Sequence, residues 1–216
     1  MSLGQGIAEA LEALAGLVAQ IGMPLAVASW LSLLAGVLLM HRRLRDQSID
    51  AHRPIAGAVG GIALVAHLVD FITTLMVTPS LALETSPLWV VVINTLGYQA
   101  ALLYGLTGKA LIVILSYQLF LWYRIQRTRL FPPPGEGSLR SFIRAFGGTR
   151  LSNLGNFLSF AFPLLSPLMF YVVLLNTTES FSTLALLPSL PAVITAWMLL
   201  LPLAYFQTSH RAWMAQ

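Results

Sequence analysis

Long apolar runs, separated by short polar segments rich in arginine, dominate the hydropathy pattern of the chain. A helix needs roughly 20 apolar residues to cross the hydrocarbon core of a bilayer. The pattern predicts five such spans, which cover residues 21–40, 55–77, 99–123, 151–175 and 184–206. We therefore expect an all-α fold, a polytopic transmembrane helical bundle that forms a single domain over residues 1–216.

Two segments next to the predicted spans have a different pattern. The stretch from Pro87 to Tyr123 is too long for one span, so Pro87–Leu96 is predicted as a short half-helix that breaks near Asn94 and Gly97. Its position, re-entrant or on the membrane surface, stays open. Residues 7–20 are predicted as a helix at the outer surface or as an extension of the first span, with a kink at Pro24.

The connection over residues 124–150 contains a proline-rich spacer followed by an amphipathic segment. Apolar residues there recur at i, i+3, i+4 and i+7, the spacing of one helix face, and they are Leu139, Phe142, Ile143 and Phe146. Arg140 and Arg144 lie on a neighbouring face, and Ser138 is available as an N-cap. The segment is predicted either as an interfacial helix, with its arginines facing headgroups, or as a helix packed on the protein's own cytoplasmic ends.

The positions of the arginines predict the orientation in the membrane. In a five-span chain every arginine falls on one side, in the segments 42–53 and 124–150 and at Arg211. Loops rich in Lys and Arg stay cytoplasmic. We therefore expect a multi-pass membrane protein with the amino terminus outside and the carboxyl terminus in the cytoplasm.

The composition supports the membrane assignment and excludes several chemistries. Hydrophobic residues make up 57% of the chain and charged residues 9%, whereas soluble domains have about 25% charged residues. The chain has 0 cysteines, which excludes disulfides, thiolate metal sites and iron–sulfur clusters. His67 is the one histidine within a span, so a haem held by two histidines is disfavoured. We expect no cofactor, no metal and no nucleic-acid partner, and an enzymatic function is disfavoured.

Ionisable side chains at membrane depth are costly and therefore mark candidate functional positions. Asp70 lies in the second predicted span and Lys109 in the third, and His67, Thr73 and Thr74 fall on the same polar stripe as Asp70. We expect Asp70 and Lys109 to pair across a helix interface, because pairing offsets the cost of burying each charge. Two roles stay open: an ion pair that fixes helix register, and a site for a solute, a lipid headgroup or a proton.

A resemblance covers about residues 64–123. The constellation Asp70-x-x-Thr73-Thr74, Glu84-x-Ser86-Pro87 and Lys109 resembles the pattern of a family of small, uncharacterised prokaryotic membrane proteins. That family has asparagine where this chain has Ser86. The resemblance implies a protein of the prokaryotic inner (plasma) membrane in which Asp70, Glu84 and Lys109 are important, and it names no activity. From the residues alone, Glu84 is interpreted first as a helix-capping acid.

Small and amide residues on the spans predict close helix packing. Gly57 and Gly61 form a GxxxG motif, and Ala101 with Gly105 repeats the spacing. Asn153 and Asn156, followed by two prolines, predict an irregular fourth span whose polar groups serve helix packing more often than a site.

Two functions are compatible with these features. The sequence favours an accessory or structural subunit of a larger membrane complex, such as a respiratory or photosynthetic one, with the lipid bilayer and other membrane subunits as partners. The alternative is a small transporter or solute-binding protein that uses the Asp70–Lys109 pair. The partner, the solute and the oligomeric state do not follow from the sequence.

Overall fold

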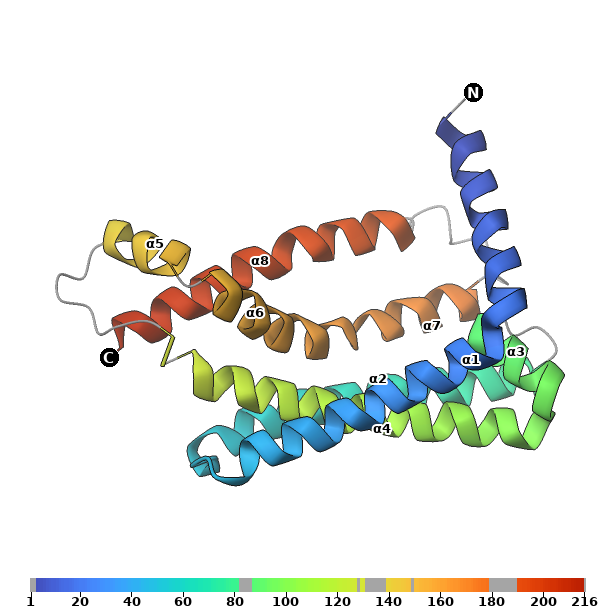
Figure 1. Ribbon diagram of the computed structural model, residues 1–216, viewed down its shortest axis with the longest axis horizontal. Helices are drawn as coiled ribbons and strands as arrows, with labels where there is room; N and C mark the ends of the chain where they lie inside the picture. The colour runs from blue at the N-terminus through green and yellow to red at the C-terminus, as the bar shows by residue number, and fades with distance from the viewer. Residues whose placement is uncertain are drawn as a thin grey trace. The chain divides into compact units, whose positions relative to one another are not determined.

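The computed structural model describes residues 3–81, 87–127, 129–130, 139–148, 150–178 and 190–215, and only the backbone at 3–20, 87, 145, 147–148, 150–151, 174–178 and 190–191. All regular secondary structure within these ranges is helical, which confirms the predicted all-α class. The helices are α1 Leu3–Arg45, η1 Asp50–His52, α2 Arg53–Val77, α3 Pro87–Leu96, α4 Tyr98–Gln126, α5 Leu139–Gly148, α6 Arg150–Leu165, α7 Leu168–Thr178 and α8 Leu190–Met214 (Figure 1).

Five stretches of the described chain are helical, long and apolar enough to cross a membrane, which is the architecture of a multi-pass membrane protein. They are Ile21–Arg45, Asp50–Val77, Tyr98–Gln126, Ser152–Val173 and Ala192–Met214. The predicted spans agree with them in number and order. The fifth differs most, because α8 continues past residue 206 to Met214, and residues 184–189 lie outside the described part.

The chain divides into two compact units. Unit 1 comprises Met1–Gly36 and Phe71–Ile112, and unit 2 comprises Val37–Asp70 and Val113–Gln216. Helices α1, α2 and α4 each contribute residues to both units. The expectation of one domain stays a prediction.

Unit 1 is built around a small core to which α1, α3 and α4 all contribute. Its buried residues are Ala26, Leu81, Val92 and Ala101. The half-helix has the predicted bounds, Pro87–Leu96, for a local reason. Gly97 follows it with φ +84°, a left-handed conformation that glycine adopts without a Cβ clash, and its N–H donates to the carbonyl of Ile93 over 2.9 Å.

Unit 2 has a larger core in which aromatic rings of three helices meet. Phe120 and Tyr123 of α4, Phe160 of α6 and Tyr205 of α8 are buried there, and the Tyr123 and Phe160 ring centroids are 4.9 Å apart. Close ring pairs of this kind stabilise a core beyond their buried area. In unit 2 the core therefore joins α4, α6 and α8.

The predicted irregularity of the fourth span is a break between α6 and α7 at Ser166 and Pro167. Proline has no N–H and interrupts the helical hydrogen bonds. The carbonyl of Leu164 instead accepts a hydrogen bond from the indole N–H of Trp197 on α8, over 2.9 Å. The break is thus stabilised from the neighbouring helix, as expected for a broken helix at membrane depth.

Candidate functional site

The predicted polar stripe lies on one continuous helix. His67, Asp70, Thr73 and Thr74 all belong to α2. His67 is buried, and its Nε2 lies 3.5 Å from the Oγ of Ser166 at the α6–α7 break. The other three are half-buried. His67 is therefore placed against the irregular part of the fourth span, a neighbour that the sequence did not suggest.

Lys109 is half-buried in α4, and one of its contacts comes from the half-helix. Its Nζ lies 6.0 Å from the ring centroid of Trp89 on α3, within the range of a cation–π interaction. Asp70 belongs to unit 2 and Lys109 to unit 1. Their pairing stays a prediction.

Trp89 of α3 contacts residues of both α2 and α4 in unit 1, and the sequence pattern did not predict this role. Its ring packs edge-on against Phe71 at a centroid distance of 6.2 Å and occupies the space beside Gly105. A Cβ at position 105 would overlap the indole. The predicted small pair Ala101–Gly105 thus receives a side chain at Gly105. The sequence feature that could have indicated this contact is a tryptophan two residues after the proline that begins the half-helix.

A polar seam also joins α1 to α4 within unit 1. The indole N–H of Trp30 donates to the Oγ1 of Thr107 over 3.0 Å, and the hydroxyls of Ser29 and Tyr104 lie 3.1 Å apart. Each partner is an uncharged group that can satisfy the other at membrane depth. This seam is a packing device that the sequence pattern did not predict.

The outer-loop residues fall largely outside the described part of the chain. Glu84 and Ser86 are outside it, and Pro87 is described only as the first residue of α3. The capping role predicted for Glu84 stays a prediction.

The amphipathic helix α5 divides its apolar residues between two environments. Phe142 is fully buried, and its ring contacts Phe206, His210 and Trp213 of α8 at centroid distances of 5.0–5.4 Å. Leu139 and Ile143 are each 53% exposed. Arg140 and Arg144 are exposed as well. One edge of α5 therefore packs on the protein, as one of the two predicted alternatives required, and the other edge stays uncovered.

The two amides predicted for the fourth span form a buried network with α8. The Nδ2 of Asn156 donates to the hydroxyl of Tyr205 over 3.2 Å, and that hydroxyl lies 3.1 Å from the Oδ1 of Asn153. Asn153 also donates to the carbonyl of Phe146 at the end of α5, over 2.6 Å. These amides hold α5, α6 and α8 together, which agrees with the packing role expected for them.

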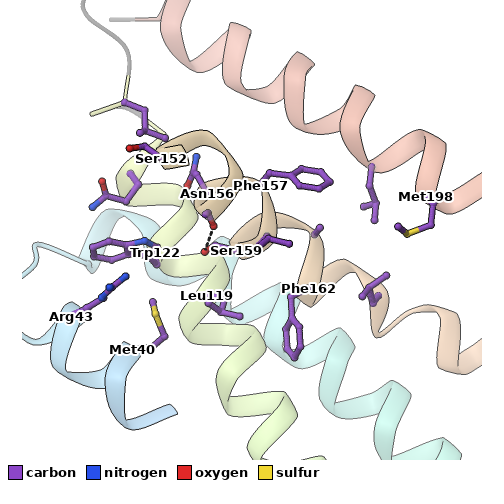
Figure 2. Close-up of a pocket in the computed structure, with 17 residues that line it drawn as sticks. Met40, Arg43, Leu119, Trp122, Ser152, Asn156, Phe157, Ser159, Phe162 and Met198 are labelled. Atoms are coloured by element: carbon purple, nitrogen blue, oxygen red, sulfur yellow. Dashed lines mark hydrogen bonds between the residues drawn. The ribbon is translucent and has the colours of Figure 1, made fainter. Parts of the chain in front are cut away.

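A cavity of about 750 Å³ lies in unit 2 between α1, α4, α6 and α8. Figure 2 shows Arg43 and Trp122 toward one end and Phe162 and Met198 toward the other. Most of its lining side chains are aliphatic, aromatic or methionine. A second cavity, of about 400 Å³, lies in unit 1 beside Trp30 and Tyr104. Asp70 and Lys109 line neither of these two cavities.

The predicted GxxxG motif of α2 does not mediate packing within the described chain. Gly57 and Gly61 are exposed, and a Cβ built at either position meets no atom of the described residues within 4 Å. Gly60 differs, because its Cβ would lie 3.2 Å from the Cβ of Tyr117 on α4. The close contact that the sequence predicted at Gly57 and Gly61 is therefore made at Gly60 instead.

Searches against known proteins returned no match: no family model, no curated protein and no solved structure matches this chain. The resemblance of residues 64–123 to a membrane-protein family stays a prediction.

Proposed function

We propose that this protein is an accessory subunit of a larger membrane complex, held to its neighbour through the open glycine face of α2. The observation that carries the proposal is that Gly57 and Gly61 sit on an exposed helix face with open space above them. Leu64 and Leu68 continue this face by one and two further turns, since they follow at helical spacing, and both are exposed.

Glycines on a helix face need a packing reason. In a helix interior each glycine costs about 1 kcal/mol relative to alanine, and contact with lipid chains does not offset that cost. Packing against a partner helix does, because two small residues four positions apart let two backbones approach closely and gain van der Waals contact. We therefore assign the face to a transmembrane helix of a partner subunit.

The predicted orientation accompanies this proposal. Within unit 2, Arg129 donates to the Oε1 of Gln47 over 2.8 Å, which joins the arginine-bearing segment after α4 to the one after α1. The contacts of Phe142 with Trp213 join α5 to the tail next to Arg211. We place the protein in a prokaryotic inner membrane. Arginines on one side of a membrane favour the cytoplasmic side, which supports an amino terminus outside.

The test is native mass spectrometry of the protein extracted from its own membrane in a mild detergent. We expect fixed, stoichiometric partner subunits with the wild type. The variant Gly57→Leu/Gly61→Leu should lose them, because two leucines hold the backbones apart. Ala196→Leu, at an exposed position of α8, is the matched control and should keep the partner subunits.

Three outcomes contradict the proposal. Wild-type protein that emerges alone excludes a stable complex, and one that emerges as a homo-oligomer points to a second copy on the glycine face. Partners that stay bound to the double variant show that the glycine face is not the contact. Helical content by circular dichroism confirms that each variant is folded.

A further inference from the structure

From the cavity of unit 2 we infer a binding site for an anionic phospholipid, with one acyl chain in the cavity and the phosphate at Arg43. The inference does not rest on the proposed subunit role, because it uses other residues. The cavity volume of about 750 Å³ lies within the range of about 300–1,000 Å³ that is usual for ligand sites.

The walls of the cavity select an apolar chain. Leu119, Phe162 and Met198 line it from three different helices, and Figure 2 shows them around the space. Ser159 is also in the wall, but its hydroxyl already donates to the carbonyl of Gly155 over 2.9 Å. A water-soluble anion would find few partners in such walls, whereas an acyl chain removes their apolar surface from water.

The mouth of the cavity selects a negative charge. The guanidinium carbon of Arg43 lies 5.6 Å from the ring centroid of Trp122, which holds the side chain over the indole. Among the described residues, no carboxylate pairs with Arg43. An unneutralised arginine next to an apolar cavity suits the phosphate of a lipid, which it can bind through two parallel hydrogen bonds.

One polar atom close to the cavity wall lacks a hydrogen-bond donor. Asn156 lines the cavity and is only 3% exposed. Its Nδ2 donates to Tyr205, but its Oδ1 accepts no hydrogen bond from the described residues. Buried acceptors without a donor are rare in native structures. Because protein atoms enclose this oxygen, it concerns the packing of α6 against α8 and adds no polar partner to the cavity.

The depth of the site agrees with a lipid as the occupant. Arg43 lies in the last turn of α1, and Gln126, also in the wall, is the last residue of α4. The charged mouth is therefore at the ends of two predicted spans, where lipid phosphates lie, and the apolar part extends along α6 and α8 into the span. Basic pockets between helix ends bind anionic headgroups in this way.

The experiment measures lipid affinity for the purified full chain in detergent, by native mass spectrometry with dioleoyl phosphatidylglycerol and dioleoyl phosphatidylcholine as probes. We expect the wild type to prefer phosphatidylglycerol. Arg43→Gln should weaken the binding of phosphatidylglycerol roughly fivefold, the usual effect of one basic residue near an anionic headgroup. It should leave the affinity for phosphatidylcholine unchanged. Arg42→Gln, an exposed neighbour outside the cavity, is the matched control and should change neither.

A cavity-filling variant separates a true pocket from surface charge. A Cβ at Gly155 meets nothing within 4 Å, so Gly155→Phe can place its ring in the cavity while α6 keeps its helix. We expect Gly155→Phe to weaken the binding of phosphatidylglycerol although Arg43 is intact. Phosphatidylglycerol with a brominated acyl chain should also quench wild-type tryptophan emission, and Trp122→Phe should lose that component.

Each of the following results overturns the inference. Equal affinity for the two lipids removes the charge selection, and equal weakening by Arg42→Gln shows diffuse attraction to the basic end. Unchanged binding by Gly155→Phe shows that no chain enters the cavity. If that variant does not fold, absence of bromine quenching that depends on Trp122 shows equally that the cavity holds no acyl chain.

Discussion

A single hydrogen atom at position 105 determines how the half-helix meets α4. The indole of Trp89 fills the space in which a Cβ of residue 105 would lie. The same indole lies near the Nζ of Lys109 and against Phe71. Cores are close-packed, so a methyl group that overlaps a ring forces the ring, the backbone or both to move. The position of Trp89, and with it the surroundings of Lys109, therefore depends on Gly105.

We predict that Gly105→Ala lowers the free energy of unfolding by about 1–3 kcal/mol, the usual cost of overpacking. Gly108→Ala is the control on the same helix, because its Cβ meets nothing within 4 Å, and it should be neutral or stabilising by up to about 1 kcal/mol. The measurement is denaturant unfolding in detergent, followed by tryptophan fluorescence. Adding Trp89→Leu to Gly105→Ala should recover part of the loss, and strictly additive effects would disprove the contact.

The hydroxyl of Tyr205 is the second residue-scale feature with a measurable consequence. It lies between Asn153 and Asn156, while its ring packs on Tyr123 and Phe160. Tyr205→Phe keeps the ring and leaves two buried amides short of a partner. We predict a loss of about 1–2 kcal/mol in unfolding free energy. Tyr98→Phe, at a 40% exposed position, should cost much less, and equal losses would show that the network is not the cause.

Residue types were easier to predict than residue neighbours. The sequence marks His67, Asp70 and Lys109 as unusual because charge and polarity at membrane depth are costly. It does not reveal that Ser166 faces His67 or that Trp89 faces Lys109. Those neighbours come from other helices, and the hydropathy of one segment contains no information about the rotation of another.

At the scale of elements, local chemistry sets some boundaries and tertiary contacts set others. The half-helix α3 begins at a proline and ends before a glycine with positive φ, so its bounds were predictable. The end of α8 was not. Its last turns contain Ser209, His210 and Arg211, which end a hydropathy window, yet the helix continues because Trp213 is buried against α5.

The docking of α5 gives the element-scale prediction. Phe142 is the residue that packs α5 on α8, whereas Ile143 on the same helix is 53% exposed. Phe142→Ala should remove about 3 kcal/mol or more of packing, and most of that loss should appear locally. We expect faster hydrogen exchange of the amides of residues 139–148, with little change in α4. Ile143→Ala should leave the exchange unchanged, and similar protection in both variants would contradict the docking.

At the scale of the whole chain, the class of protein followed from composition, and the site did not. Five apolar runs and few charges are sufficient to predict a polytopic helical bundle. The cavity of unit 2 has walls from α1, α4, α6 and α8, and no short motif marks it. The glycine motif of α2 was recognised, but only the structure shows that Gly60 rather than Gly57 or Gly61 contacts α4.

The orientation of the chain is the prediction that belongs to this scale, and the absence of cysteine makes it directly testable. Single cysteines introduced as Gln5→Cys, Gln47→Cys and Ala215→Cys report on the first helix, the first arginine-bearing loop and the tail. We expect a membrane-impermeant maleimide to label Gln5→Cys in intact cells and the other two only after permeabilisation. The physical reason is that short arginine-rich segments resist translocation.

The reverse labelling pattern would invert the chain and would place Arg43 and the lipid site in the outer leaflet. Labelling of Gln47→Cys and Ala215→Cys from opposite sides would mean an odd number of crossings between them. One of the stretches from Asp50 to Met214 would then lie on the membrane or re-enter it. The expected pattern, with both positions inside, requires an even number of crossings after the first loop and agrees with the four helical spans counted there.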